Sequence, residues 1–160
     1  MEWKEIKISY REYDGIDRLP DEWKWLVEKA REVAKNAWAP YSNFNVGAAV
    51  KLTNGVILTG NNQENAAYPD GLCAERTALF YANANYPNDA VEVVAVTAGN
   101  ANGWLPQPVT PCGSCRQVFL EIETRFGKPI KIILAGEEKV WVFDGADSII
   151  PFNFTAASML

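Results

Sequence analysis

The sequence contains no histidine and only three cysteines among its 160 residues. Histidine and cysteine are common zinc ligands, so a soft metal site in this chain must depend on its thiols. No apolar run approaches the roughly 20 residues of a membrane-spanning helix, and we expect no membrane partner. Acidic residues outnumber basic ones by 20 to 15, which gives a net charge of −5. This balance argues against a polynucleotide partner, because nucleic-acid binding depends on basic patches.

The first residues and the cysteine count favour a reducing compartment. Residues 1–5 are polar and lack the apolar segment of a secretory signal. An odd number of cysteines does not suit a disulfide framework. We therefore expect a cytoplasmic location. The length suits a single domain over residues 1–160 with one sizeable core.

The spacing of apolar residues predicts an α/β fold. Helices are expected at residues 20–38, 73–84 and 111–125, and strands at 46–52, 56–59, 91–97, 130–135 and 140–143. Residues 5–13 also alternate, as in an edge strand or an N-terminal arm. Asn54-Gly55 predicts a hairpin between two of the strands. Five strands interleaved with three helices predict a three-layer α/β/α sandwich, with a five-stranded mixed sheet covered by helices on both faces.

All three cysteines lie in two short motifs, Cys73-Ala74-Glu75 and Pro111-Cys112-Gly113-Ser114-Cys115. Each motif opens a predicted helix, where free N–H groups and the helix dipole stabilise thiolates. Structural zinc sites usually have four protein ligands, whereas catalytic sites have three and keep one open position. Three cysteines therefore favour an open, water-activating zinc site.

Three neighbouring side chains are candidates to assist such a site. Glu75 lies two residues after Cys73, and a shielded carboxylate there can carry protons to and from a reacting group. Arg76 and Gln117 each lie near a cysteine and are candidates to donate to the sulfurs. For Arg76, a surface salt bridge is an equally reasonable interpretation.

Two rival interpretations of the cysteines are weaker. A purely structural zinc domain needs a fourth ligand and leaves Glu75 without a role. A thiol oxidoreductase that uses Cys112 and Cys115 leaves Cys73-Ala74-Glu75 unexplained. Neither accounts for both motifs, so we prefer the zinc enzyme.

Zinc deaminases share a ligand-x-Glu segment followed by Pro-Cys-x-x-Cys. With both segments present, the sequence resembles the small, homotetrameric cytidine deaminases from about Trp38 to Phe154. The resemblance rests on four motifs, which are Tyr41–Ala49, Asn62–Tyr68, Cys73–Ala78 and Pro111–Gln117. It divides the chain into an N-terminal arm (1–19), a first helix (20–38) and a catalytic core (39–154).

The resemblance implies hydrolysis of cytidine and deoxycytidine to uridine and deoxyuridine in pyrimidine salvage. One Zn²⁺ per subunit would be bound by Cys73, Cys112 and Cys115, and Glu75 would move protons between water, N3 of the base and the leaving ammonia. The implied substrate-binding residues are Phe44, Asn62, Glu64, Ala66, Tyr68, Ala74 and Phe154. The implied assembly is a homotetramer with active sites shared between subunits, to which Ala66, Tyr68 and Phe154 would contribute across interfaces.

Three segments depart from the family pattern. They are Pro69-Asp70-Gly71 after Tyr68, the long loop from Gly99 to Pro111, and the N-terminal arm. A deaminase of another nucleoside-like aminopyrimidine is the main alternative, but Phe44, Asn62 and Glu64 favour a plain nucleoside.

Overall fold

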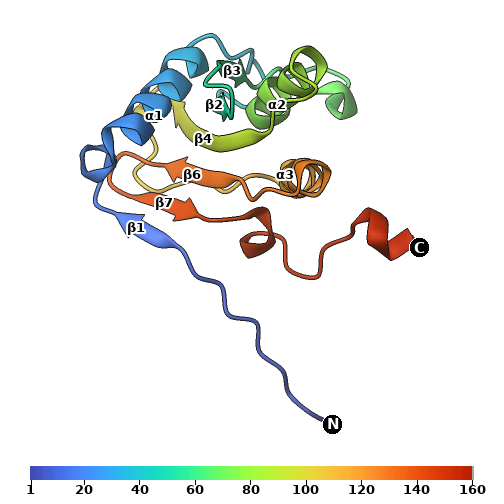
Figure 1. Ribbon diagram of the computed structural model, residues 1–160. Coiled ribbons are helices and arrows are strands. Elements are labelled where there is room, and N and C mark those ends of the chain that lie inside the picture. Colours follow the sequence, from blue (N-terminus) through green and yellow to red (C-terminus); the bar gives the residue numbers. More distant parts are fainter. Residues whose placement is uncertain (160) are drawn as a thin grey trace.

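The computed structural model describes residues 1–159, which form one mixed sheet with three α-helices (Figure 1). The strands are β1 (Arg11–Tyr13), β2 (Asn45–Leu52), β3 (Ile57–Asn61), β4 (Val91–Asn100), β5 (Gly103–Trp104), β6 (Lys131–Ala135) and β7 (Val140–Phe143). The helices are α1 (Asp21–Ala34), α2 (Ala74–Asn85) and α3 (Gly113–Phe126). No helix among residues 1–159 is both long and apolar enough to cross a bilayer.

The strands form a single sheet in the order β1-β7-β6-β4-β2-β3, with β5 paired to the end of β4. Among the described residues, β4 and β6 are the only neighbouring strands that pair in parallel, and α3 lies in the connection between them. The mixed α/β sheet is as predicted, but the predicted number of five strands is wrong, because the sheet has seven. The two additional strands are β1, which lies within the alternating segment over residues 5–13, and β5, whose two residues are too few to produce a pattern.

Two apolar layers cover the two faces of the sheet, as the alternation of side chains in a strand requires. On β2, Ala48 and Val50 pack with the helices α2 and α3, whereas Ala49 packs against α1. β4 alternates in the same way and is buried along nearly its whole length. The expected three-layer arrangement with helices on both faces is therefore confirmed.

Most element boundaries follow local signals. Pro20 precedes the first residue of α1, and Gly127 ends α3 with a left-handed φ of 61°. Gly55 turns the β2–β3 hairpin with a φ of 86°. The first helix is shorter than the predicted 20–38, because it ends at Ala34. Beyond this end, the Trp38 N–H donates instead to the Asn62 carbonyl at 3.0 Å.

The N-terminal arm forms much less strand than its alternation predicts. Only residues 11–13 pair, with β7, and the prediction of a strand over residues 5–10 is wrong. Figure 1 shows this segment running away from the body of the protein. Next to β1, the ring of Tyr10 stacks on that of Phe143 with centroids 5.5 Å apart.

Candidate metal centre and active site

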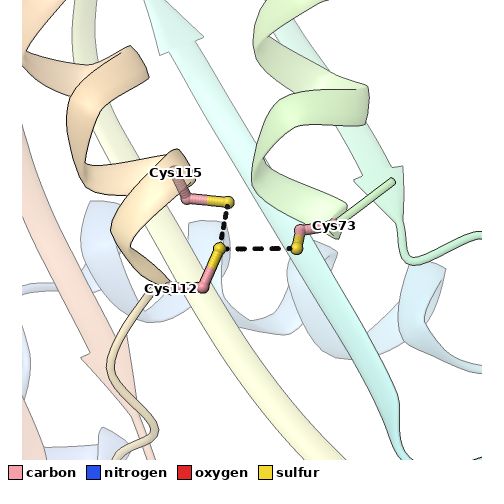
Figure 2. A group of neighbouring side chains, drawn as sticks. All are labelled: Cys73, Cys112 and Cys115. Atoms are coloured by element: carbon pink, nitrogen blue, oxygen red, sulfur yellow. Dashed lines mark hydrogen bonds between the residues drawn. The ribbon is translucent and has the colours of Figure 1, made fainter. Parts of the chain in front are cut away.

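The two cysteine motifs meet at the N-termini of α2 and α3. Cys73 is the N-cap residue of α2, Cys112 is the N-cap residue of α3, and Cys115 lies in the first turn of α3. The chain between the two motifs contains β4, so the helices start from distant points in the sequence. Figure 2 shows the three side chains pointing toward one another from the two helices.

The three sulfurs have the spacing that a metal ion requires. The Sγ atoms of Cys73 and Cys112 are 3.8 Å apart, those of Cys112 and Cys115 are 3.5 Å apart, and all three lie within 4.8 Å of one another. Tetrahedral zinc with Zn–S bonds of about 2.3 Å separates its sulfurs by about 3.8 Å. The donor set therefore fits zinc. Cys115 is fully buried, Cys73 is half-buried and Cys112 is exposed, so the centre opens on one side.

Hydrogen bonds polarise the thiol cluster. The neighbouring Cys115 thiol, together with the Arg76 guanidinium, lowers the pKa of Cys73 to about 5. The neighbouring Cys73 sulfur, together with burial, raises the pKa of Cys115. Arg76 Nη2 lies 3.6 Å from the Cys73 sulfur and stabilises its negative charge. Because metal ligands must be thiolates, binding of a metal releases the protons that the cluster still holds.

Glu75 lies directly behind the thiols on the first turn of α2. Its side chain is only 4% exposed, and it is one of two buried polar or charged residues in the described chain. Burial raises the pKa of this carboxyl, with a further contribution from the negative charge of Cys73. A carboxyl of raised pKa, shielded from water and next to a metal site, suits the transfer of protons at neutral pH.

A cavity of about 530 Å³ opens beside Cys73, the one thiol of the cluster that lines it. It is lined by Tyr41, Ser42, Asn62, Gln63, Glu64, Asn65, Tyr68, Gly71, Leu72, Cys73 and Arg76. The predicted residues Asn62, Glu64 and Tyr68 thus share one cavity with the metal-site residues Cys73 and Arg76. Its volume lies within the range of small-molecule sites.

Asn62 and Glu64 also hold the cavity wall together. The Asn62 amide accepts a hydrogen bond from the Val46 N–H at 2.8 Å and donates to the Phe44 carbonyl at 2.9 Å. The Glu64 carboxylate accepts hydrogen bonds from the N–H of Tyr41 at 2.9 Å and from the N–H and the hydroxyl of Ser42. The Ser42 hydroxyl, followed by the Tyr41 N–H, lowers the pKa of Glu64, so this carboxylate is ionised at neutral pH.

The other predicted residues lie outside the lining of this cavity. Ala74 is fully buried in the core beneath α2, and Phe44 contributes its backbone carbonyl to Asn62. Ala66 is exposed on the loop before Tyr68. Phe154 is 58% exposed on the C-terminal segment. Gln117 donates from Nε2 to the Phe154 carbonyl at 2.8 Å, so in the structure its partner is a backbone oxygen of that segment.

Several wall residues were not identified from the sequence. Tyr41 and Ser42 occur in the first motif, but only the folded chain brings their backbone N–H groups to Glu64. The rings of Tyr41 and Tyr68 contact edge to face with centroids 6.0 Å apart, although 27 positions separate them. The amide-rich composition of the loop over residues 61–65 was the available signal that this region forms a polar site.

Comparisons with known proteins agree with this geometry. A family model described as the cytidine and deoxycytidylate deaminase zinc-binding region matches residues 20–127. A cytidine deaminase of Halalkalibacterium halodurans is 43% identical over 97 residues, which cover 61% of this chain and 69% of that protein. A cytidine deaminase of Mycobacterium tuberculosis is 36% identical over 104 residues, which cover 64% of this chain and 74% of that protein. The crystal structure of cytidine deaminase from Burkholderia pseudomallei superimposes with a TM-score of 0.69 at 34% identity and covers 85% of this chain and 100% of that one.

Proposed function

Because the chain belongs to the cytidine and deoxycytidylate deaminase family, we propose that it hydrolyses cytidine and deoxycytidine to uridine and deoxyuridine with release of ammonia. The observation that carries this proposal is the cluster of three thiols, next to the buried Glu75, one of whose members, Cys73, lines a cavity of small-molecule size. The reaction belongs to pyrimidine salvage. The domain over residues 1–160 combines the arm at 1–19, the first helix and the catalytic core over residues 39–154.

Cys73, Cys112 and Cys115 are the zinc ligands, with one Zn²⁺ per subunit. Zinc, when bound there, supplies a Lewis acid that brings the ionisation of a water molecule near neutral pH. Arg76 donates toward the Cys73 sulfur and offsets the excess negative charge of three thiolates. Gln117 is the second proposed donor to the ligand sulfurs. In the single chain its amide donates instead to the Phe154 carbonyl.

Glu75 moves the protons of the reaction. It accepts a proton from the attacking water and delivers it to N3 of the pyrimidine, which makes C4 more electrophilic. Once the new C–O bond has formed at C4, Glu75 takes the second proton from that oxygen and delivers it to N4. The C4–N4 bond then breaks, ammonia leaves and C4 keeps a carbonyl oxygen. The pKa of the buried Glu75 carboxyl is raised toward neutral pH, and this supports both roles, because the group can then both accept and release a proton.

Asn62 and Glu64 bind the ribose hydroxyls. Each keeps spare hydrogen-bonding capacity, since Asn62 uses one of its two N–H donors and each carboxylate oxygen has more than one lone pair. The loop that contains Tyr41 and Ser42 orients the Glu64 carboxylate toward the cavity. Phe44, Ala66, Tyr68, Ala74 and Phe154 complete the proposed substrate-binding set.

The enzyme assembles as a homotetramer whose active sites are shared between subunits, and it acts in the cytoplasm. The exposure of Phe154 supports active sites that are shared between subunits. In the single chain 58% of this residue is exposed to solvent, so it is free to contact a neighbouring subunit. Size-exclusion chromatography with light scattering measures the assembly directly. A fully active monomer contradicts the role given to Phe154, and to Ala66 and Tyr68, across subunits.

Metal content measured together with substrate turnover tests the function. We expect about one zinc per chain and release of ammonia from cytidine and deoxycytidine, with little turnover of cytosine or adenosine. Cytosine serves as the matched control for ribose recognition. Absence of zinc, or zinc without cytidine turnover, overturns the proposal, and preferred turnover of another aminopyrimidine points to the alternative substrate class.

A further inference from the structure

Gly60 lies in β3 directly beneath the first turn of α2. It is buried and pairs with Ala48 as a regular strand residue, so its backbone conformation does not explain the glycine. Space explains it instead. A methyl group at residue 60 would lie 2.6 Å from the Ala78 nitrogen, 2.7 Å from the Ala74 carbonyl oxygen and 3.0 Å from Thr77 Cβ. Two of these three atoms belong to the helix backbone and cannot rotate away.

We propose that Gly60 is a positioning residue for the metal centre, because it sets the depth at which α2 rests on the sheet. This inference rests on the proposed function for the identity of the metal site. Cys73 and Glu75 both lie at the end of α2 that contacts Gly60, whereas Cys112 and Cys115 belong to α3. The depth of α2 therefore determines how far the Cys73 sulfur lies from the other two.

A short chain of contacts links Gly60 to the thiol. Thr77 rests on Gly60, and both its N–H and its hydroxyl donate to the Cys73 carbonyl, at 3.0 and 3.1 Å. Ala74, whose carbonyl oxygen also rests on Gly60, directly follows Cys73. A displacement of this helical turn is thus transmitted to Cys73 through its backbone.

The size of the shift of α2, more than its direction, decides whether the zinc geometry is disturbed. Relieving the 2.6 Å contact to an ordinary distance of 3.4 Å requires a movement of about 0.8 Å. In metal sites the metal–ligand distances agree with their usual values within about 0.2 Å. Gly60→Ala is therefore expected to disturb the zinc geometry even if the protein folds around the added methyl group.

Gly47 provides a matched control on the opposite face of the same hairpin. It lies in β2, pairs with Asn61 and faces α1, so that a methyl group there would lie 1.9 Å from the Ala30 carbonyl oxygen. The collision again involves helix backbone and is more severe than at Gly60. None of the three cysteines is in α1, so Gly47→Ala should lower stability without changing the sulfur spacing.

The test compares zinc affinity in the full-length wild type, Gly60→Ala and Gly47→Ala. Affinity is measured by competition with a chromophoric chelator, after near-UV circular dichroism has confirmed folding. We expect Gly60→Ala to bind zinc about 10–100-fold more weakly, as when groups that support metal ligands are changed. Cobalt-substituted Gly60→Ala should also show shifted ligand-field bands. Gly47→Ala should unfold at a lower temperature and keep the zinc affinity and the bands of the wild type.

Two further variants keep the test decisive if either alanine variant does not fold. Leu26→Ala replaces Gly47→Ala, because Leu26 is buried on the same α1 face. Thr77→Ala replaces Gly60→Ala, because it removes the hydroxyl that donates to the Cys73 carbonyl without adding volume, and it should weaken zinc binding to a smaller degree. Unchanged zinc affinity in the α2-face variants, or equal losses on both faces, overturns the inference. A wild type that binds zinc but does not deaminate cytidine refutes the proposed function and leaves this inference intact.

Discussion

Apolar clusters cover both faces of the sheet, but the two faces differ in their chemistry. On one face, Leu26, Val27 and Ala30 of α1 pack against the strands, and the described cluster of buried residues there contains no titratable side chain. On the other face, α2 and α3 cover a larger core and also hold the three thiols and Glu75. The difference lies in the ends of the helices, since α2 and α3 bring their N-termini and the three thiols together. A buried face becomes reactive when helix ends meet there, and burial alone supplies only stability.

The largest expected effect comes from removing one thiol from the reactive face. Cys73→Ser should abolish both stable zinc binding and turnover, because two of three ligands remain and the third sulfur position is lost. Zinc per chain and ammonia release are the measurements. Ser114→Ala is the control. Ser114 is exposed and directly precedes Cys115, and the variant should keep both the zinc content and the ammonia release of the wild type. Full zinc occupancy in Cys73→Ser would remove this residue from the ligand set.

Glu75→Gln should separate metal binding from proton transfer. The amide has nearly the same shape as the carboxyl but cannot carry a proton, so we expect kcat to fall by about 10²–10⁴-fold. Zinc content should remain that of the wild type, because Glu75 is not among the clustered thiols. A kcat close to that of the wild type contradicts the proton-transfer role.

One substitution made on both faces sharpens the comparison further. Leu26→Ala and Leu79→Ala each remove a nearly fully buried leucine, one from α1 and one from α2. Each should cost about 2–5 kcal/mol in the free energy of unfolding. Only Leu79→Ala should also lower zinc affinity or kcat, because α2 contains Glu75. Denaturant unfolding and steady-state kinetics are the measurements, and a lowered kcat in Leu26→Ala would show that the faces are coupled.

The smallest expected effect is a pH dependence at Glu123 of α3. Burial raises the pKa of this carboxyl, although it accepts hydrogen bonds from the N–H groups of Ile130 and Ala146. The folded state therefore holds the proton more tightly, and stability falls as pH rises from the ordinary glutamate pKa near 4.3 through the raised value.

The substitution Glu123→Gln should remove this loss of folding stability at high pH. The variant should have a higher unfolding temperature than the wild type at pH 8, and the difference should shrink toward pH 4. Glu121→Gln, at an exposed position of the same helix, serves as the control. A difference between Glu123→Gln and wild type that does not vary with pH contradicts the assignment.

The sequence predicted those features that depend on local signals. Proline, glycine and apolar periodicity placed the starts of α2 and α3 within a residue or two, and hence both cysteine motifs. The N-terminal arm was overpredicted because alternation does not reveal whether a partner strand exists. β7 has only four residues, so it pairs with three residues of the arm.

Features fixed by distant contacts were not predicted. The end of α1 depends on the bond between Trp38 and the Asn62 carbonyl, which no helix propensity describes. Likewise, the sequence suggested Glu64 as a polar site residue but not its bonds to Tyr41 and Ser42, which lie more than 20 positions away. The space beneath α2 that requires glycine at residue 60 also depends on how the helix and the sheet meet.

The position of β4 between the two cysteine motifs has a consequence for biosynthesis. Cys73 and Cys112 are 39 positions apart. At a translation rate of about 5–20 residues per second, the first thiol leaves the ribosome roughly 2–8 seconds before the second. During that interval the nascent chain offers a metal ion a single cysteine. The three thiols come together only where the N-termini of α2 and α3 meet, so the full ligand set exists only when these two helices, made seconds apart, lie side by side at those ends.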